Sequence, residues 1–391
     1  MNLYPDENQR HTLFPVCASK IFLAHAAVTV LPRGVADAIE RCAETGAQSH
    51  QEDEQTWRDV KATRVVAAKL INAHPDEIAL LGPTALGLSL FANGLTWRAG
   101  DEVVCYGDDY PANVYAWMDL QRHGVVLKYL QPDRPGEITP ALVEAALSDR
   151  TRLVALASAH FFSGYRIDVD TIGQLAHSRG ALFAVDAIQT LGAFPFDATH
   201  VDFLAADAHK WLLGPNGIGI VMVKREQFEH LRPTLLGAWN VVSPGFIAQD
   251  EIRFVPTAQR YEPGSLNLLG IAGMRAGLDL ILAAGVDRIA ERLIELKTVL
   301  LRHLDELGFE IIGPREGPTA HAITTAFHPR VDAGGLHDAL QKACIVCSLR
   351  RDREGRSYLR FSPHFYNTEV EFDRVALVLR EAIEKQASET V

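Results

Sequence analysis

Short apolar runs alternate with longer helical stretches through the first half of the chain, and this alternation limits the possible folds more than any other feature. The runs are residues 102–106, 125–130, 153–157 and 182–186. Such runs are typical of parallel strands buried on both faces, and the helical stretches between them fit the crossovers that parallel strands need. The sequence therefore predicts an α/β fold with a mainly parallel sheet wrapped by helices.

The flanking parts of the chain suggest a second, smaller unit. Residues 20–27 are expected to form a short strand that enters a turn of small residues, and most of 35–73 has helical patterning. From about Asp287 onward, helical segments alternate with strands at 322–327 and 358–361, which suits a small α+β domain. A chain of 391 residues is long enough to divide in this way.

Composition and charge limit the partners and the compartment. The net charge of -11 argues against nucleic acid or an anionic membrane as a partner, because neither is attracted to an acidic surface. No apolar stretch approaches the roughly 20 residues of a spanning helix, and residues 1–8 do not resemble a secretory signal. Five cysteines at scattered positions do not form a disulfide framework. We therefore expect a cytoplasmic protein.

Lys210 is the first candidate for chemistry. It stands in the segment Ala208-His209-Lys210-Trp211, between an apolar run and a Gly-rich turn. A lysine among small and apolar neighbours is partly desolvated, which favours the free amine that condenses with a carbonyl as a Schiff base. Taken alone, such a lysine is more often a surface residue at a strand end.

Asp186 gives Lys210 a partner. It ends the apolar run 181–186, and the carboxyl end of a parallel strand is where ligands bind in open α/β sheets. A carboxylate there can keep a pyridinium nitrogen protonated, which pyridoxal phosphate needs if its ring is to act as an electron sink. We therefore interpret Asp186 and Lys210 as a catalytic pair.

Four segments, in order, resemble the class V branch of the fold-type I enzymes that use pyridoxal phosphate, the branch of cysteine desulfurases, selenocysteine lyase, kynureninase and isopenicillin N epimerase. They are Asp186-Ala187-Ile188-Gln189, Ala208-His209-Lys210 with Gly217-Ile218-Gly219 following, Tyr261-Glu262-Pro263-Gly264-Ser265, and Arg360-Phe361-Ser362-Pro363-His364-Phe365-Tyr366-Asn367-Thr368. The resemblance implies pyridoxal 5'-phosphate as the cofactor and a seven-stranded sheet in a large domain. With the patterning above, it divides the chain into a lead (1–20), a large cofactor-binding domain (21–265), and a linking helix with a small C-terminal domain (266–391).

The resemblance assigns the cofactor's phosphate to a helix start. Thr84 follows a Gly-Pro turn and is expected to cap the helix, whose positive end attracts a dianion. Ala85 and Leu86 are implied through their backbone amides, and His209 through its side chain.

Further residues are assigned to the cofactor ring and to a second subunit. Tyr110 matches the ring that stacks on the pyridine, while His160 and Gln189 match residues that hydrogen-bond its phenolic oxygen. Gly264 and Ser265 complete the set, and Ser265 matches a hydroxyl that reaches the phosphate of the neighbouring subunit. The resemblance therefore implies a homodimer with active sites at the interface.

The resemblance assigns the substrate carboxylate to Arg360. A guanidinium fork suits that role because it pairs with both oxygens at once, although a surface arginine is the alternative. Ala27, in the turn of small residues, is also implied as a substrate contact. Arg350 is considered at the substrate entrance but is not assigned.

Other polar residues are set aside. Many relatives carry a small or hydroxyl residue where this chain has Asp207, and a carboxylate facing a phosphate is unfavourable, so we exclude Asp207 from the phosphate site. Cys344 and Cys347 have CxxC spacing, but they lie in an apolar run without a second such pair, so we interpret them as part of a core strand. We assign no metal site.

The type of reaction stays open. The desulfurases of this family carry a catalytic cysteine shortly before the carboxylate-binding arginine, whereas residues 348–359 contain none, so a sulfur-delivering desulfurase is disfavoured. The leading hypothesis is a class V aminotransferase-like enzyme for a small amino acid. The alternatives are a cysteine or selenocysteine lyase-like β-eliminating enzyme, an amino-acid epimerase, and a noncatalytic binding protein that has kept the fold.

Overall fold

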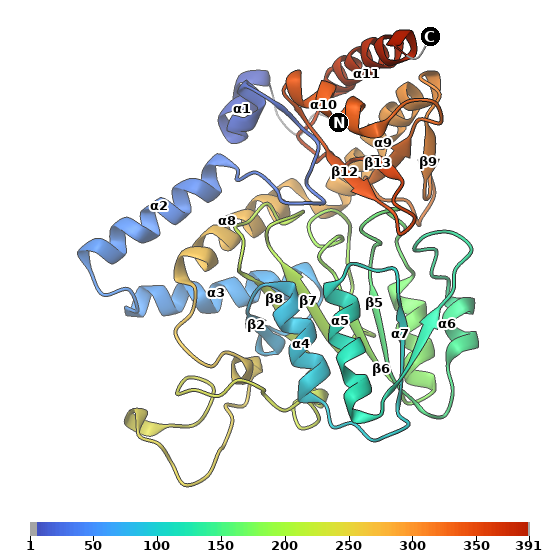
Figure 1. Cartoon of the computed structure of the whole chain (residues 1–391). Helices are drawn as coiled ribbons and strands as arrows, with labels where there is room; N and C mark the ends of the chain where they lie inside the picture. The colour runs from blue at the N-terminus through green and yellow to red at the C-terminus, as the bar shows by residue number, and fades with distance from the viewer. Residues whose placement is uncertain (1–5, 390–391) are drawn as a thin grey trace.

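A seven-stranded sheet forms the centre of the computed structural model, which describes residues 6–389 (Figure 1). In spatial order its strands are β2 (Ile78–Leu80), β8 (Gly219–Val223), β7 (Phe203–Asp207), β6 (Leu182–Asp186), β5 (Thr151–Ala157), β3 (Glu102–Tyr106) and β4 (Val126–Leu130). Strand β8 is antiparallel to both of its neighbours, and the other pairings are parallel. The prediction of a mainly parallel α/β sheet is confirmed.

Burial explains why the sequence pattern located these strands. Every residue of β3, β7 and β8 is buried, as continuous apolar runs predict. Strand β4 lies at the edge and is more open, with Val126 42% exposed. Each predicted strand begins or ends within two residues of the observed one.

Helices cover both faces of this sheet. Two of them, α4 (Thr84–Gly94) and α5 (Ala112–Met118), share a core with alternate residues of the strands, including Val103 and Phe203. The opposite face packs on α6 (Pro140–Ala146) and α7 (Val169–Ser178). Helix α4 lies so close to β7 that a Cβ added at Gly87 would be 2.7 Å from the Cβ of Ala205.

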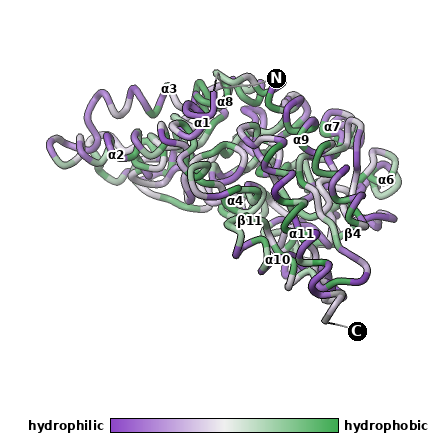
Figure 2. Tube along the Cα trace, turned by 90° about the horizontal axis from the view of Figure 1, so that it is seen from above, coloured by the Kyte–Doolittle hydropathy of each residue, from purple (hydrophilic) through white to green (hydrophobic). Residues whose placement is uncertain are grey.

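A group of long helices reaches out to one side of the sheet. It consists of α2 (Arg33–Gln48), α3 (Glu54–Leu70) and the inner part of α8 (Leu268–Ala284), and α2 and α3 extend away from the remaining chain in both views (Figures 1 and 2). The predicted helical region 35–73 is therefore two helices, separated where Asp53 caps α3 by accepting from the Thr56 amide at 2.7 Å. In the described part of the chain, no single helix is long and apolar enough to cross a membrane. Within residues 6–389, the pair α8 and α9 is long and apolar enough when taken together, but the two helices are bent by 79°.

The C-terminal part builds a smaller α+β unit around a third core. It contains α9 (Val286–Glu306), α10 (Ala333–Lys342), α11 (Glu369–Glu389) and an antiparallel sheet in the order β12 (Ser348–Arg351), β13 (Ser357–Phe361), β10 (Thr324–Phe327) and β9 (Glu310–Ile312). Strand β1 (Ile21–Phe22) pairs with β11 (Ile345–Val346), so the N-terminal segment joins this unit. The domain boundary at residues 265 and 266 stays a prediction, and residues 1–5 of the predicted lead lie outside the described residues.

Shorter elements complete the chain. Helix α1 (Glu7–Leu13) precedes β1, and single 3-10 turns occur at Pro15–Ala18, Pro75–Glu77, Asp119–His123, Arg225–Gln227, Pro244–Phe246 and Ala258–Tyr261. The CxxC segment is only partly a core strand: Cys347 is buried, whereas Cys344 is exposed and has a positive φ of 60°.

Candidate active site

Asp186 and Lys210 meet at the carboxyl edge of the large sheet. Asp186 is the last residue of β6, and Lys210 follows the end of β7, the next strand in the sheet. The amide of Ala208 donates to the Ile218 carbonyl at 2.8 Å, which fixes the turn that carries Lys210. Parallel strands thus deliver both side chains to the edge where ligands bind in such folds.

Lys210 is buried, with 5% of its surface exposed, and no hydrogen bond to its amine is found within residues 6–389. Its Nζ lies 5.2 Å from the centre of the Tyr110 ring. Burial lowers the pKa of Lys210. The charge of Asp186 raises this pKa, whereas the charges of Arg360 and Arg350 lower it further. The amine is therefore shifted toward the neutral form that reacts with carbonyl carbon.

Asp186 is also buried and has a second carboxylate close by. Its Oδ1 accepts from the amide of Ile188 at 3.0 Å. Burial raises the pKa of Asp186, and the hydrogen bond from Ile188 lowers it. The charge of Asp109 raises the pKa further. Asp109 accepts from the amide of Tyr110 at 2.7 Å, and burial raises its own pKa to about 6. Sequence reasoning missed Asp109, although the acidic doublet immediately before Tyr110 was a signal for it.

Gln189 is held in one orientation. Its Nε2 donates to the carbonyl of Ala26 at 3.1 Å, and its Oε1 accepts from Nε1 of Trp211 at 2.8 Å. These two bonds set which end of the amide is the donor. The second N–H of Nε2 stays available for a ligand oxygen, which agrees with the predicted contact to a phenolic oxygen.

His160 is less free than the resemblance implies. Its Nδ1 lies 3.0 Å from Oγ of Ser163, and its Nε2 lies 3.2 Å from the carbonyl of Asp108. Burial lowers its pKa to about 4, so the ring is neutral at pH 7. A bond from His160 to a cofactor oxygen requires one of these two contacts to be replaced, and the assignment stays a prediction.

The start of α4 differs in one respect from the prediction. Thr84 is the first helical residue and not the cap: Pro83 occupies the cap position, and the Thr84 hydroxyl accepts from the amide of Asp207 at 2.9 Å. The Leu86 amide already donates to the Pro83 carbonyl at 2.8 Å. First-turn amides lack partners within a helix, so Ala85 is the more open of the two predicted backbone donors.

Asp207 lies between the residues predicted to bind the phosphate. Its Oδ1 accepts from the His209 amide at 3.3 Å and lies 2.9 Å from Nδ1 of the same residue, while its Oδ2 is buried without a hydrogen-bond partner among residues 6–389. The exclusion of Asp207 from the phosphate site stays a prediction. Asp207 thus contacts both Thr84 and His209, two of the residues predicted to bind the phosphate.

Arg360 and Arg350 approach the site from the C-terminal sheet. Arg360 is 1% exposed, and its Nη1 donates to the carbonyl of Phe161 at 2.6 Å, while Nη2 lies 3.5 Å from Oγ of Ser348. Burial, with the charge of Arg350, lowers the pKa of Arg360 to about 9, so the guanidinium is still a cation at neutral pH. An anion-binding group thus lies close enough to Lys210 to act on its charge.

The N-terminal segment covers the same region. The amide of Thr29 donates to the His209 carbonyl at 2.7 Å, and Ala27 lies two residues earlier. This bond joins the segment of Ala27 to the turn that carries Lys210, and the substrate contact of Ala27 stays a prediction. Gly264 and Ser265 lie elsewhere on the surface: a Cβ at Gly264 meets open space, and Ser265 is exposed.

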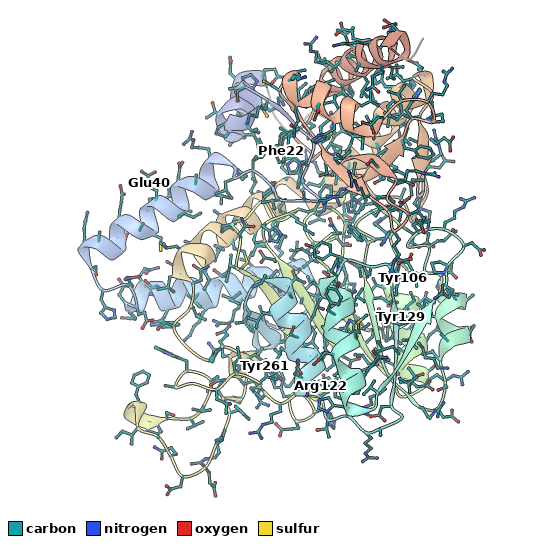
Figure 3. All side chains as sticks on the ribbon, in the orientation of Figure 1. Phe22, Glu40, Tyr106, Arg122, Tyr129 and Tyr261 are labelled. Atoms are coloured by element: carbon teal, nitrogen blue, oxygen red, sulfur yellow. The ribbon has the colours of Figure 1, made fainter. Side chains whose placement is uncertain are left out.

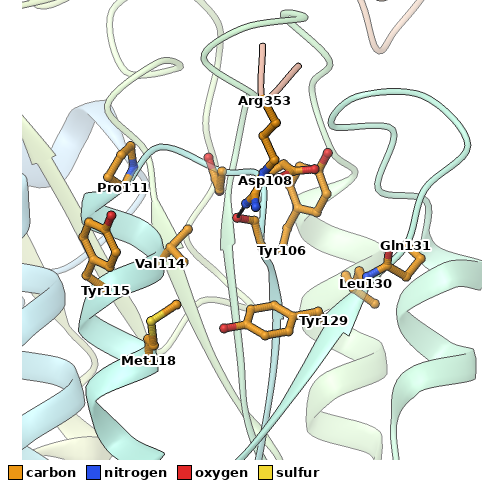
Figure 4. A pocket seen from close by; sticks show the side chains of 12 residues that line it. Tyr106, Asp108, Pro111, Val114, Tyr115, Met118, Tyr129, Leu130, Gln131 and Arg353 are labelled. Atoms are coloured by element: carbon orange, nitrogen blue, oxygen red, sulfur yellow. Dashed lines mark hydrogen bonds and ion pairs between the residues drawn. The ribbon is translucent and has the colours of Figure 1, made fainter. Parts of the chain in front are cut away.

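A contact between the two sheets closes one side of the site. The loop after β12 places Arg353 in an ion pair with Asp108 and within 2.7 Å of the Gly107 carbonyl (Figure 4). Below it, Tyr106 and Tyr129 lie near each other at the same end of the sheet (Figure 3). The hollow of about 530 Å³ that they line backs onto Asp109 and does not include Lys210 among its lining residues.

The cysteine of a sulfur relay is missing from this loop. Residues 348–359 contain no cysteine, and Cys347 is 5% exposed with a pKa that burial raises to about 12. A thiol so buried and so weakly acidic is a poor nucleophile.

The residues present fit pyridoxal phosphate. The lysine amine is open, a buried acid faces it, and a half-exposed aromatic ring lies beside it. The first turn of α4 and the ring of His209 supply polar groups that suit the phosphate, and Asp207 stays excluded from that set. An amine, an acid, a ring and a helix start are the groups that the cofactor's carbonyl, ring nitrogen, ring face and phosphate need.

Comparisons with known proteins agree with this chemistry. The family model for aminotransferase class-V matches residues 21–375. A probable cysteine desulfurase of Methanothermobacter thermautotrophicus is 27% identical over 94% of this chain and 96% of its own length, and the uncharacterized aminotransferase YcbU of Bacillus subtilis is 26% identical over 98% of both. Among solved structures, a cysteine desulfurase of Thermococcus onnurineus superposes with a TM-score of 0.90 at 23% identity, over 98% of this chain and all of that one. The chain therefore belongs to the aminotransferase class-V family and is a pyridoxal phosphate-dependent enzyme of the fold-type I class.

Proposed function

We propose that the protein is an aminotransferase-like enzyme that acts on a small amino acid through Lys210. The observation that carries this proposal is the placement of Lys210: its amine is buried, makes no hydrogen bond within residues 6–389, and is close enough to Asp186 and Arg360 for both charges to act on it. Bound pyridoxal phosphate supplies the electron sink that stabilises negative charge at the substrate's α-carbon.

Each residue has a distinct part in this proposal. Lys210 would hold the cofactor through its amine and would move a proton at the substrate's α-carbon. Asp186 keeps the ring nitrogen protonated, and Tyr110 covers the ring. Gln189 would donate to the phenolic oxygen, and Arg360 would bind the substrate carboxylate through two parallel N–H groups of its guanidinium.

The cofactor phosphate is assigned to the first turn of α4 and to His209. The amide of Ala85 lies in the first turn at the positive end of that helix, where an anion is stabilised. Ser265 is assigned to the phosphate of a neighbouring subunit, and its exposure supports that assignment. The segment before it exposes apolar side chains, among them Phe246 at 67% and Ile247 at 68%, which a homodimer would cover. The cytoplasmic location stays a prediction.

A β-eliminating lyase is the second candidate. Relatives over the whole chain are named probable cysteine desulfurases, and a structure of similar fold is a cystine C-S lyase. The Cys-free loop at residues 348–359 argues against sulfur transfer through a protein thiol but not against elimination, which needs only the lysine and the electron sink.

The deciding experiment follows the visible spectrum of the holoenzyme while amino acids are added and keto acid, ammonia and sulfide are assayed. An aminotransferase loses the lysine-bound absorbance band with one equivalent of keto acid and regains it with a second keto acid. A lyase keeps the band while keto acid and ammonia accumulate, and an epimerase exchanges the α-proton without keto acid. A band that is absent in wild type, or that persists in Lys210→Ala, would overturn the role of Lys210; Lys297→Met is the matched control, because it removes a buried lysine elsewhere.

A further inference from the structure

Arg350 and Arg360 are diagonal neighbours on one face of the C-terminal sheet. Ser348 of β12 pairs with Arg360 of β13, and Arg350 pairs with Tyr358. Because side chains alternate between the two faces of a strand, these four residues share one face. Arg360 is buried and Arg350 is half-buried, and the Nε atoms of both are enclosed without a hydrogen-bond partner.

The nearest acids do not neutralise this pair. Asp108 forms an ion pair with Arg353, and Asp352 accepts from the hydroxyl of Tyr358. Within residues 6–389, no ion pair or hydrogen bond joins a carboxylate to Arg350 or Arg360. Two like charges that are diagonal on a sheet and partly removed from water destabilise each other, so the pair is suited to anions that a ligand brings.

One substrate carboxylate accounts for only one of the two guanidiniums. Arg360 uses Nη1 for the Phe161 carbonyl, and the edge formed by Nε and Nη2 makes only the 3.5 Å contact of Nη2 with Oγ of Ser348. That edge carries two parallel N–H groups, which match both oxygens of one carboxylate. When the α-carboxylate occupies it, Arg350 keeps its donors and its charge.

We propose that Arg350 binds a second carboxylate at the end of the substrate's side chain, so that the enzyme acts on acidic α-amino acids such as aspartate or glutamate. This inference rests on the proposed function, because it takes Arg360 as the site of the α-carboxylate beside Lys210. The charges of Arg350 and Arg360 both act on Lys210, so the two arginines and the lysine belong to one site. The arginines that follow in the sequence do not: Arg351 is exposed, and Arg353 is paired.

The test measures binding of unreactive acids to the holoenzyme by calorimetry. Succinate and glutarate carry two carboxylates, butyrate carries one, and none has the amine that would react with the cofactor. Wild type should bind the better of the two diacids at least about tenfold more tightly than butyrate, since a charge-assisted hydrogen bond is lost without the second anion. Arg350→Gln should remove this preference and leave the affinity for butyrate within about twofold, whereas Arg360→Gln should weaken both classes.

Arg351→Gln is the matched control and should change neither affinity, because it removes an exposed arginine next in the chain. If Arg350→Gln weakens butyrate as much as the diacids, both guanidiniums grip one carboxylate and the proposal is wrong. It is also wrong if wild type shows no preference for a diacid. Should Arg350→Gln fail to fold, the wild-type comparisons of aspartate with asparagine and of glutamate with glutamine decide, because each pair differs in charge at nearly equal size.

The two proposals fail in different ways. A preference for diacids without turnover of any amino acid would refute the aminotransferase or lyase function and leave the second carboxylate site standing. Turnover of neutral amino acids, with no preference for a diacid, would refute the second site alone.

Discussion

Lys210 and Lys297 are both buried, yet the structure uses them in opposite ways. Lys297, on α9, is 1% exposed and donates to the Ile323 carbonyl at 3.0 Å and to the Thr324 hydroxyl at 3.3 Å. Burial lowers the pKa of Lys297 to about 7, as it also lowers that of Lys210. A buried lysine with a lowered pKa is therefore not, by itself, an active-site lysine. Among the described residues the amine of Lys210 has no hydrogen bond, and it lies at a sheet edge with an acid and two arginines, whereas the amine of Lys297 makes two hydrogen bonds that join α9 to the C-terminal sheet.

Substitution of each lysine by methionine should separate the two roles most strongly. Lys210→Met should lower turnover by about 1000-fold or more and remove the visible band of the bound cofactor, because the covalent attachment is lost. Lys297→Met should keep the band and turnover within a few-fold. Steady-state rates and spectra of both variants check this, and comparable losses of turnover in the two would remove the distinction drawn here.

The contrast extends to two buried carboxylates at opposite ends of the large sheet. Asp186→Asn should lower kcat/KM by roughly 100-fold or more, because the ring nitrogen loses its charged partner. Glu102, at the start of β3, accepts from Ser148 at 2.6 Å and lies 2.8 Å from Arg150, and the Ser148 hydrogen bond lowers its pKa. Glu102→Gln should therefore reduce stability and leave kcat/KM nearly unchanged, which urea unfolding and kinetics on both variants can determine. An unchanged kcat/KM in Asp186→Asn would contradict its role.

The capture of cofactor by apoenzyme should reveal the environment of the Lys210 amine. Because only the neutral amine reacts, the capture rate should rise with pH and level off well below pH 10.5, the ordinary pKa of lysine. Asp186 raises the pKa of Lys210 and Arg350 lowers it, so Asp186→Asn should move the midpoint to lower pH and Arg350→Gln to higher pH. Stopped-flow absorbance at several pH values measures these midpoints, and shifts of the same sign in both variants would refute this account.

The sequence predicted the sheet well because the strands depend on local patterns, and the same patterns brought Lys210 and Asp186 forward as candidates, whose catalytic roles stay predictions. Continuous apolar runs located the strands, and a lysine and an acid at strand ends identified the site. The N-cap was assigned one residue late, because the choice between Pro83 and Thr84 depends on backbone angles that the residue types do not fix. The pairing of Ile21 with Ile345 and the diagonal placement of Arg350 and Arg360 depend on tertiary register, which has no local signal.

Lys297 shows most clearly that residue types along a helix do not specify its tertiary packing. In Ile294-Glu295-Leu296-Lys297 it has the ordinary appearance of a polar residue on an amphipathic helix. Its burial follows from the packing of α9 against the C-terminal sheet, where the Ile323 carbonyl and the Thr324 hydroxyl supply oxygen partners. No pattern within the helix specifies that packing, so the sequence distinguishes Lys210 from a surface lysine but not Lys297.

The pH dependence of stability tests whether Lys297 has a lowered pKa in the folded protein, and its expected effect is the smallest. The pKa of Lys297 is about 7 in the folded chain, against an ordinary value of 10.5, so between these values the unfolded state binds more protons. The free energy of unfolding then rises with pH across that window, and the contribution of Lys297 is lost as pH falls toward 7. Urea unfolding at pH 7, 8 and 9 should show that the free energy of unfolding of wild type, relative to that of Lys297→Met, rises by on the order of 1 kcal/mol per pH unit. Lys210 is present in both proteins and cancels in the difference, so a difference that does not depend on pH would mean that Lys297 keeps an ordinary pKa and that its two oxygen partners hold it charged.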